Sequence, residues 1–169
     1  MRAETGDEMS IASTVDFALS LTDVDFKILS HQKTWTSDAS AHAGHVGPEQ
    51  MAKAVALKDE LGPLLAVLPA SHRLEIESLR ESLRRPALEF MGEEQLAEVF
   101  FDCERGAVPP LGPDYLVPTV VDLALTAQDD IYFEAGDHVE LIHVSATSFR
   151  TLMRGAEYMA FSTLADKKD

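Results

Sequence analysis

Two apolar stretches joined by a short turn constrain the fold of this 169-residue chain more than any other feature. Residues 52–58 (AKAVALK) and 64–68 (LLAVL) have the length and composition of strands. The connection Glu60-Leu61-Gly62-Pro63 is typical of a hairpin. Because a hairpin makes its strands antiparallel, whereas parallel strands need a long crossover, we predict an α+β sheet or barrel and not a doubly wound parallel sheet.

Helices and strands alternate along the rest of the chain. Apolar spacing predicts helices over residues 10–23, 36–44 and 93–100, between Pro69 and Pro86, and after Ser145. Further strands are predicted over residues 25–31, 117–123, 131–134 and 139–144. We expect Ser37 or Asp38 to cap the second helix, Gly44 to stop it, and Ser145 to cap the last one.

A chain of this length fits one domain, which we place at residues 10–162, with a flexible N-terminus at residues 1–9 and a flexible tail at residues 163–169. No apolar run reaches the roughly 18 residues that span a bilayer, and the acidic N-terminus lacks the apolar segment of a secretory signal. The single cysteine, Cys103, suits a reducing compartment. We therefore expect a cytoplasmic protein without a membrane partner.

The formal net charge of −15 is large for a chain of this size. Such a field repels polyanions over long range, so it argues against non-specific nucleic-acid binding driven by counterion release. It is compatible with a local basic entrance on an acidic body. It also suits an acidic surface that meets a basic partner.

The segment at residues 105–113 (RGAVPPLGP) holds three prolines and two glycines in nine residues, which predicts a fixed loop. Glycine lets the backbone approach a ligand closely, and proline fixes φ and removes a competing donor. Together they can hold a backbone N–H group at a set position, as an oxyanion site or a carboxyl clamp requires. The alternative is a rigid turn between a helix and a strand.

Lys53 lies near the start of the first hairpin strand. Strand alternation places its side chain on one face with Val55 and Leu57. If that face is core, the lysine needs an anionic partner or a ligand, because an unpaired buried ammonium is costly. The alternative is a lysine at a strand end that reaches water along its aliphatic stem.

Six histidines raise the question of a metal site. His42 and His45 are three residues apart and His138 and His143 are five apart, but neither pair comes with the helix-borne glutamate or the cysteine pair of a zinc site. We therefore predict no metal and no cofactor. His31 and His138 are interpreted as polar groups at strand ends near a cleft, with hydrogen-bonded structural histidines as the alternative.

Other reactive side chains give weaker signals. Cys103 is flanked by Asp102 and Glu104, whose carboxylates raise a thiol pKa, so we predict no nucleophilic role. The sequence also lacks a nucleophile elbow, a P-loop and a dinucleotide-binding glycine motif. Four arginines could form either a phosphate-binding edge or a solvated helix face: Arg73, Arg80, Arg84 and Arg85.

Several of these features occur in an order that resembles one family. In chain order they are His31 after a helix and a strand, Ala52-Lys53-Ala54-Val55, Leu65-Ala66-Val67-Leu68-Pro69-Ala70, Arg73-Leu74, the Gly106-x-x-x-Pro110 loop and Gly136-x-His138. Over about residues 10–162 the set is similar to the YbaK/prolyl-tRNA synthetase editing-domain family. The resemblance implies a mixed, largely antiparallel, barrel-like sheet surrounded by helices.

The resemblance also implies an activity and a site. Family members hydrolyse mischarged aminoacyl-tRNA, notably tRNA-Pro carrying alanine or cysteine, which implies a trans-acting deacylase that binds the 3′ aminoacyl-adenosine end. Lys53 matches the family lysine that contacts the phosphate or ribose of that adenosine, and the Gly106 loop matches the motif that cradles the aminoacyl group. Lys53 and Gly106 are therefore assigned as catalytic. The implied substrate-binding residues are His31, Ala107, Val108, Pro109, Pro110 and His138.

Such chemistry asks little of side chains, because an aminoacyl ester is already labile. Positioned water and a stabilised oxyanion suffice, with help from the substrate's ribose hydroxyl as the resemblance implies, so we expect a metal-independent hydrolase. A synthetase is a candidate docking partner, and a homodimer is plausible for a compact acidic domain. Two other functions stay open: a non-catalytic module that binds a nucleotide, tRNA or small ligand, and a signalling module with a basic partner.

Overall fold

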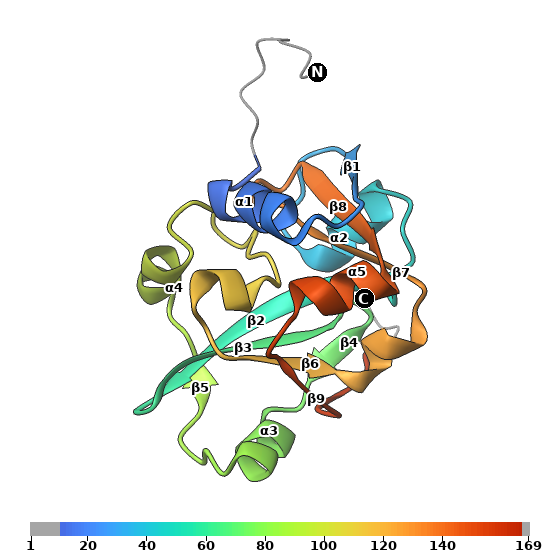
Figure 1. The fold of residues 1–169 in the computed structure, drawn as a ribbon. Coiled ribbons are helices and arrows are strands. Elements are labelled where there is room, and N and C mark those ends of the chain that lie inside the picture. The colour runs from blue at the N-terminus through green and yellow to red at the C-terminus, as the bar shows by residue number, and fades with distance from the viewer. Residues whose placement is uncertain (1–10, 167–169) are drawn as a thin grey trace.

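The predicted hairpin lies in the middle of the sheet. The structure, a computed structural model, describes residues 11–166 (Figure 1). Strands β2 (Met51–Asp59) and β3 (Gly62–Pro69) pair antiparallel, with Asp59 opposite Gly62 across a two-residue turn. Gly62 has a φ of 113°, a conformation that favours glycine. The predicted hairpin and the α+β class are confirmed.

The main sheet has the strand order β1-β8-β7-β2-β3-β6-β9, and β5 also pairs with β2. The pairs β2–β7, β3–β6 and β6–β9 are parallel, and the others are antiparallel. A separate antiparallel pair joins β4 and β10. This is the mixed, mostly antiparallel sheet that was predicted. The remaining strands are β1 (Lys27–Ser30), β4 (His72–Leu74), β5 (Glu89–Phe90), β6 (Thr119–Asp122), β7 (Asp130–Glu134), β8 (Glu140–Ser145), β9 (Glu157–Met159) and β10 (Ser162–Leu164).

Helices surround this sheet, as predicted, and differ from the prediction mainly at their ends. They are α1 (Ser13–Thr22), α2 (Ser37–Ala43), α3 (Ile76–Leu83), α4 (Glu93–Val99), α5 (Ala146–Leu152) and the 3-10 helices η1 (Gly112–Tyr115) and η2 (Leu123–Ala127). Ser145 caps α5, as predicted, by accepting from the Ser148 N–H. The predicted cap of α2 is wrong, because Thr36 accepts the Ala39 N–H at 3.1 Å. Helix α3 ends before Pro86, at a left-handed Arg84.

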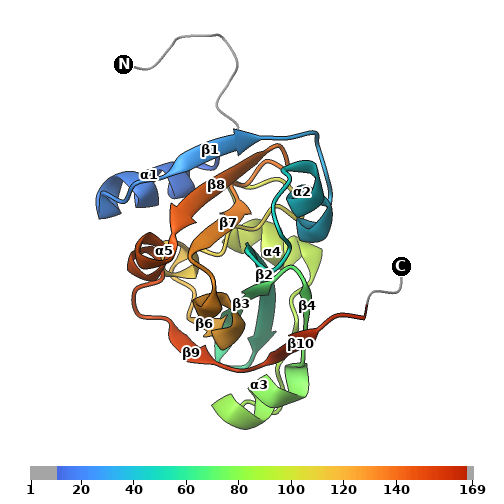
Figure 2. The same cartoon turned by 90° about the vertical axis from the view of Figure 1, so that its right-hand side faces the viewer.

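Alternation along β2 divides the core between the two faces of the sheet. Ala52 packs with residues of α1 and α5 in the largest apolar cluster. On the opposite face, Met51 packs beside α2 and Leu57 packs beside α3, in two smaller clusters. Figure 2 shows α1 and α5 on one side of β7 and β8, and α2 on the other. Lys53 shares the face of Met51 and Leu57, between the two smaller clusters, as its spacing predicted.

The arginines near α3 hold the fold together. Arg85 donates from Nε to Asp59 Oδ2 at 2.7 Å and from Nη2 to the Gly62 carbonyl at 2.9 Å, which fixes the hairpin turn. Its hydrogen bond holds the pKa of Asp59 below its usual range. Arg80 donates to the Leu88 carbonyl at 3.0 and 2.7 Å. The predicted phosphate-binding edge or solvated face is therefore wrong for Arg80 and Arg85.

The folded chain extends further toward the C-terminus than predicted. In β10, Leu164 pairs with His72, and the Ala165 N–H donates to the Ser71 carbonyl at 2.9 Å. The prediction of a flexible tail is therefore wrong for residues 163–165. The predicted flexible segment at residues 1–9 lies outside the described residues. Among residues 11–166, no helix is long and apolar enough to cross a membrane.

Candidate functional site

The loop after α4 carries Gly106 in a conformation that other residues rarely adopt. Gly106 has a φ of 77° and is exposed. A Cβ at this position would lie 3.4 Å from Cε1 of His138 and 3.8 Å from the carbonyl oxygen of Trp35. The backbone conformation therefore favours glycine, while a Cβ would make ordinary van der Waals contacts with the two neighbouring segments.

The rest of the predicted loop is packed against the core. Ala107 is fully buried, Pro109 and Pro110 are buried, and Val108 packs against the largest apolar cluster. These four residues, which were expected to bind substrate, hold the loop in place. Gly106 is left at the surface, beside His138.

Four amide N–H groups of this loop donate to no acceptor within the described residues: those of Arg105, Gly106, Val108 and the fully buried Leu111. Gly106 and Val108 flank Ala107, whose N–H donates to the Glu104 carbonyl at 3.1 Å. Gly106 is exposed and Val108 is half-buried, so neither amide is sealed in the core. Unpaired backbone donors on a rigid loop are the groups that stabilise an oxyanion in acyl transfer.

His138 is buried directly against this loop. It is 1% exposed, and its Nε2 donates to the Arg105 carbonyl. Because a carbonyl only accepts, Nε2 carries the proton, and Nδ1 has no partner among residues 11–166. The imidazole also packs against the Trp35 ring, with 5.1 Å between ring centroids. His138 therefore connects the Gly106 loop to the segment that precedes α2.

A group of buried polar side chains adjoins His138. Ser40 of α2 donates from Oγ to Glu134 Oε1 and lies 2.5 Å from the Thr34 hydroxyl. Glu134 and Asp137 are 3% and 2% exposed. Four atoms of this region have no hydrogen-bond partner within the described residues: Glu134 Oε2, Asp137 Oδ2, His138 Nδ1 and His31 Nε2. Unpaired buried polar atoms are costly and concentrate at functional sites.

Burial raises the pKa of the Glu134 carboxyl. The Ser40 hydrogen bond and the nearby His138 and His31 oppose this shift, and Asp137 adds to it. Glu134 was not among the residues predicted from the sequence. Its signal was a carboxylate placed between the apolar residues Phe133 and Ala135 of a buried strand.

Lys53 lies on the same face of the sheet as Glu134. In the parallel β2–β7 pair, Ala52 is opposite Phe133, so Lys53 and Glu134 follow on the other face. Burial lowers the pKa of Lys53, and the nearby Asp38 carboxylate opposes this shift. Within the described residues Lys53 forms no ion pair, and its Nζ donates to the carbonyl of His72. It is a half-buried cation that can accept an anionic ligand.

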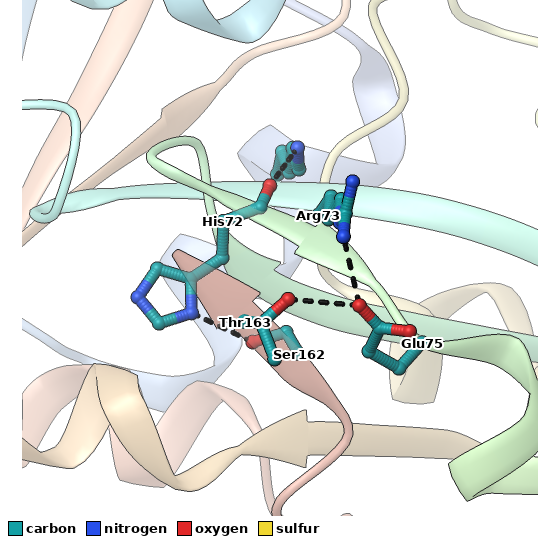
Figure 3. Close-up of polar contacts among 6 residues, drawn as sticks. His72, Arg73, Glu75, Ser162 and Thr163 are labelled. Atoms are coloured by element: carbon teal, nitrogen blue, oxygen red, sulfur yellow. Dashed lines mark hydrogen bonds and ion pairs between the residues drawn. The ribbon is translucent and has the colours of Figure 1, made fainter. Parts of the chain in front are cut away.

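His72, whose carbonyl accepts the hydrogen bond from Lys53, is held in place by the C-terminal strand (Figure 3). His72 Nδ1 lies 2.9 Å from the Ser162 hydroxyl, and Thr163 donates to Glu75 at 2.8 Å. Arg73 also pairs with Glu75, at 3.3 Å. The His72–Ser162 contact joins β4 to β10, and the Thr163–Glu75 bond joins β10 to the residue after β4, so the C-terminal strand helps to place the ammonium of Lys53.

Of the predicted site residues, the structure places Gly106 beside His138 and links Lys53 to them only through other residues. Gly106 and His138 are in contact, and His31 acts electrostatically on Glu134 beside them. No hydrogen bond or ion pair joins Lys53 to Gly106 or His138 within the described residues. Lys53 is connected to them through α2, which carries Asp38 beside the lysine and Ser40 against Glu134.

Gly106 also lines a groove of about 480 Å³ that opens beside α4. Leu96, Phe100 and Val108 give it apolar walls, and Glu104 and Arg105 lie at its polar side. Cys103 also lines it, and burial raises the pKa of this thiol to about 12, with Asp102 adding to the shift. This shift favours the protonated thiol at neutral pH, and the absence of a nucleophilic role for Cys103 stays a prediction.

The other histidines have structural partners or stand apart. His143 lies 2.8 Å from Asp130 and stacks on Tyr132, with ring centroids 4.4 Å apart. His42 and His45 are exposed. Within residues 11–166, no three His, Cys, Asp or Glu side chains are grouped so that they could hold a metal ion.

Comparison with known proteins gives one family. A family model of the aminoacyl-tRNA editing domain matches residues 31–152, which is most of the chain and includes every predicted site residue. A search of curated protein sequences finds no match.

Solved structures show the same fold. A protein described as a "putative trans-editing enzyme for prolyl tRNA synthetase" superposes with a TM-score of 0.79 at 21% identity, over 94% of this chain and 99% of that chain. A scaffold from epitope backbone grafting by computational design gives 0.80 at 19% identity, over 94% and 100%. A "putative signal transduction protein" from Marinobacter aquaeolei VT8 gives 0.73 at 22% identity, over 89% of this chain but only 30% of that chain.

Proposed function

Because the chain belongs to the aminoacyl-tRNA editing domain family, we propose that it hydrolyses the ester of a mischarged tRNA in trans. The observation that supports the proposal is the exposed Gly106 beside His138, in a loop where the Gly106 and Val108 amides have no acceptor within the described residues. The substrate class is tRNA-Pro carrying a small amino acid, alanine or cysteine, in line with the described role of one protein of the same fold.

The proposed chemistry divides the work between the loop and the lysine. In the attack of water on the ester carbonyl, negative charge develops on the carbonyl oxygen, where the Gly106 and Val108 amides stabilise it. The ester C–O bond then breaks, and the ribose oxygen leaves with the proton that the attacking water gives up, which releases the free amino acid. Lys53 holds the phosphate or ribose of the terminal adenosine, since it is a half-buried cation without an ion pair among the described residues.

The reaction is proposed to need no metal, because an aminoacyl ester is labile enough for positioning and oxyanion stabilisation to suffice. Equal deacylation rates with and without EDTA support this part, and a loss of activity on chelation that zinc or magnesium restores overturns it. The net charge of −15 disfavours strong binding of free tRNA. We therefore propose that the protein, as a monomer or a homodimer, docks on a cytoplasmic synthetase, which delivers the mischarged tRNA.

The test is a panel of alanyl-, cysteinyl-, seryl- and prolyl-tRNA-Pro incubated with the purified protein. Release of alanine or cysteine, with prolyl-tRNA-Pro left intact, supports the proposal and names the amino acid. Full retention of all four esters overturns it. Saturable tRNA binding without release would identify a binding module instead.

A further inference from the structure

The only tryptophan of the chain, Trp35, lies beside the candidate site with its side chain in solvent. Trp35 is 68% exposed, although burying so large an apolar surface is normally favourable. Its ring packs on the buried His138, and its carbonyl oxygen lies 3.8 Å from the Cβ position of Gly106. An exposed indole thus packs on His138, and the backbone that carries it lies near Gly106.

We propose that Trp35 is the stacking platform for the terminal adenine base of the tRNA substrate, a role that rests on the proposed function. In an aminoacyl-tRNA one ribose separates the ester from that base. If the Gly106 and Val108 amides hold the carbonyl oxygen, the base must lie within one sugar of them, and Trp35 is the candidate because its backbone lies near Gly106 and its ring packs on His138. Base stacking on an aromatic ring needs no net positive charge, so it suits a chain with a net charge of −15.

Lys33 supplies the cation that such a platform uses. Its Nζ lies 5.2 Å from the centroid of the Trp35 ring and 3.1 Å from Glu104 Oε2. The lysine is half-exposed, so its ammonium can exchange the carboxylate for a backbone phosphate of the bound strand. The pair Lys33–Trp35 therefore offers one contact to a phosphate and one to a base.

Two other exposed aromatic side chains, on α1 and β5, do not share this position. Phe17 on α1 is 64% exposed and Phe90 on β5 is 60% exposed, and neither contacts Gly106 or His138 among the described contacts. Phe17 is therefore a matched control, since it exposes an aromatic ring to a similar degree on another element.

The direct test is intrinsic fluorescence, which reports on Trp35 alone because no other tryptophan is present. The full chain is titrated with adenosine monophosphate and with a short RNA ending in CCA. Saturable quenching of the emission, kept in Phe17→Ala, supports the proposal. Unchanged emission with both ligands up to millimolar concentrations overturns it. This readout needs no catalysis, so it is independent of whether the chain deacylates tRNA.

Steady-state kinetics give the second arm. Trp35→Ala is expected to raise KM for the mischarged tRNA about 5- to 100-fold with little change in kcat, because stacking is a binding contact. Trp35→Phe, which keeps an aromatic face, is expected to recover most of that loss, and Phe17→Ala to behave as wild type. An unchanged KM in Trp35→Ala overturns the platform and leaves the deacylase in place. A wild type that releases no amino acid overturns the deacylase.

Discussion

The backbone of Gly106 and the imidazole of His138 lie so close that any side chain at position 106 would touch the ring. A Cβ would lie 3.4 Å from Cε1 of His138, and the neighbouring Arg105 carbonyl accepts from Nε2 of the same ring. A contact between a loop and a segment 32 residues later thus fixes the position of the unpaired amides.

Replacing Gly106 by alanine is expected to reduce deacylation far more than stability. A side chain at its φ of 77° costs about 1–2 kcal/mol, and the added methyl comes into van der Waals contact with His138. Gly155→Ala is the matched control, since Gly155 has a φ of 81° and open space around its Cβ position. Chemical unfolding should show similar losses for both variants, while only Gly106→Ala loses at least tenfold in deacylation rate. Equal rates in the two variants would contradict a catalytic role for the loop.

Glu134→Gln is expected to stabilise the protein at neutral and higher pH. Burial raises the pKa of Glu134 in the folded state, because the buried site favours the neutral carboxyl. Below about pH 4 the carboxyl is protonated in both the folded and the unfolded state, so it does not lower the free energy of unfolding there. As pH rises through the raised folded pKa, the fold must bury a charge with one unpaired oxygen, and wild-type stability falls relative to the variant.

The measurement is urea unfolding between pH 4 and pH 8. Near pH 4 the two proteins should agree, and at pH 8 the variant should gain about 1–3 kcal/mol. Glu98→Gln, at an exposed position on α4, should show no such gain. A gain that is the same at every pH would rule out the titration of Glu134 as its cause.

Cys103 is expected to react slowly with iodoacetamide in the native protein. Burial raises the pKa of its thiol to about 12, so at pH 8 the thiolate is roughly a thousandfold rarer than in an ordinary cysteine. Mass spectrometry of labelled native and denatured protein measures the two rates. Similar rates would show an accessible thiolate, and loss of deacylation in Cys103→Ala would show that the thiol contributes to activity.

The sequence predicted the hairpin, most helices and the face of Lys53, because each depends on local periodicity or on glycine and proline. It missed β4, β5, β9 and β10, since strands of two or three residues are too short for alternation to show. It also placed the C-terminal boundary too early, because β10 is fixed by pairing with β4 about 90 residues earlier.

In the candidate site too, local sequence predicts some residues, and only the folded structure shows others. Gly106 and Pro110 stand out in the sequence because their residue types restrict the backbone. Glu134 does not, since its partner Ser40 lies 94 residues away and only the packed fold brings them together. Trp35 was visible as the single tryptophan, but its place beside Gly106 depends on how β1 and α2 meet the distant loop.

The most direct test of the proposed site is the rate of alanine release from alanyl-tRNA-Pro by wild type, Lys53→Ala and Lys58→Ala. Both lysines lie on β2, but Lys53 is half-buried without an ion pair, whereas Lys58 pairs with Glu89 at the surface. Losing a contact to a phosphate costs about 10- to 100-fold, so Lys53→Ala should be slower by that factor while Lys58→Ala keeps the wild-type rate. Equal rates in all three proteins would contradict the site, and no release by the wild type would contradict the deacylase.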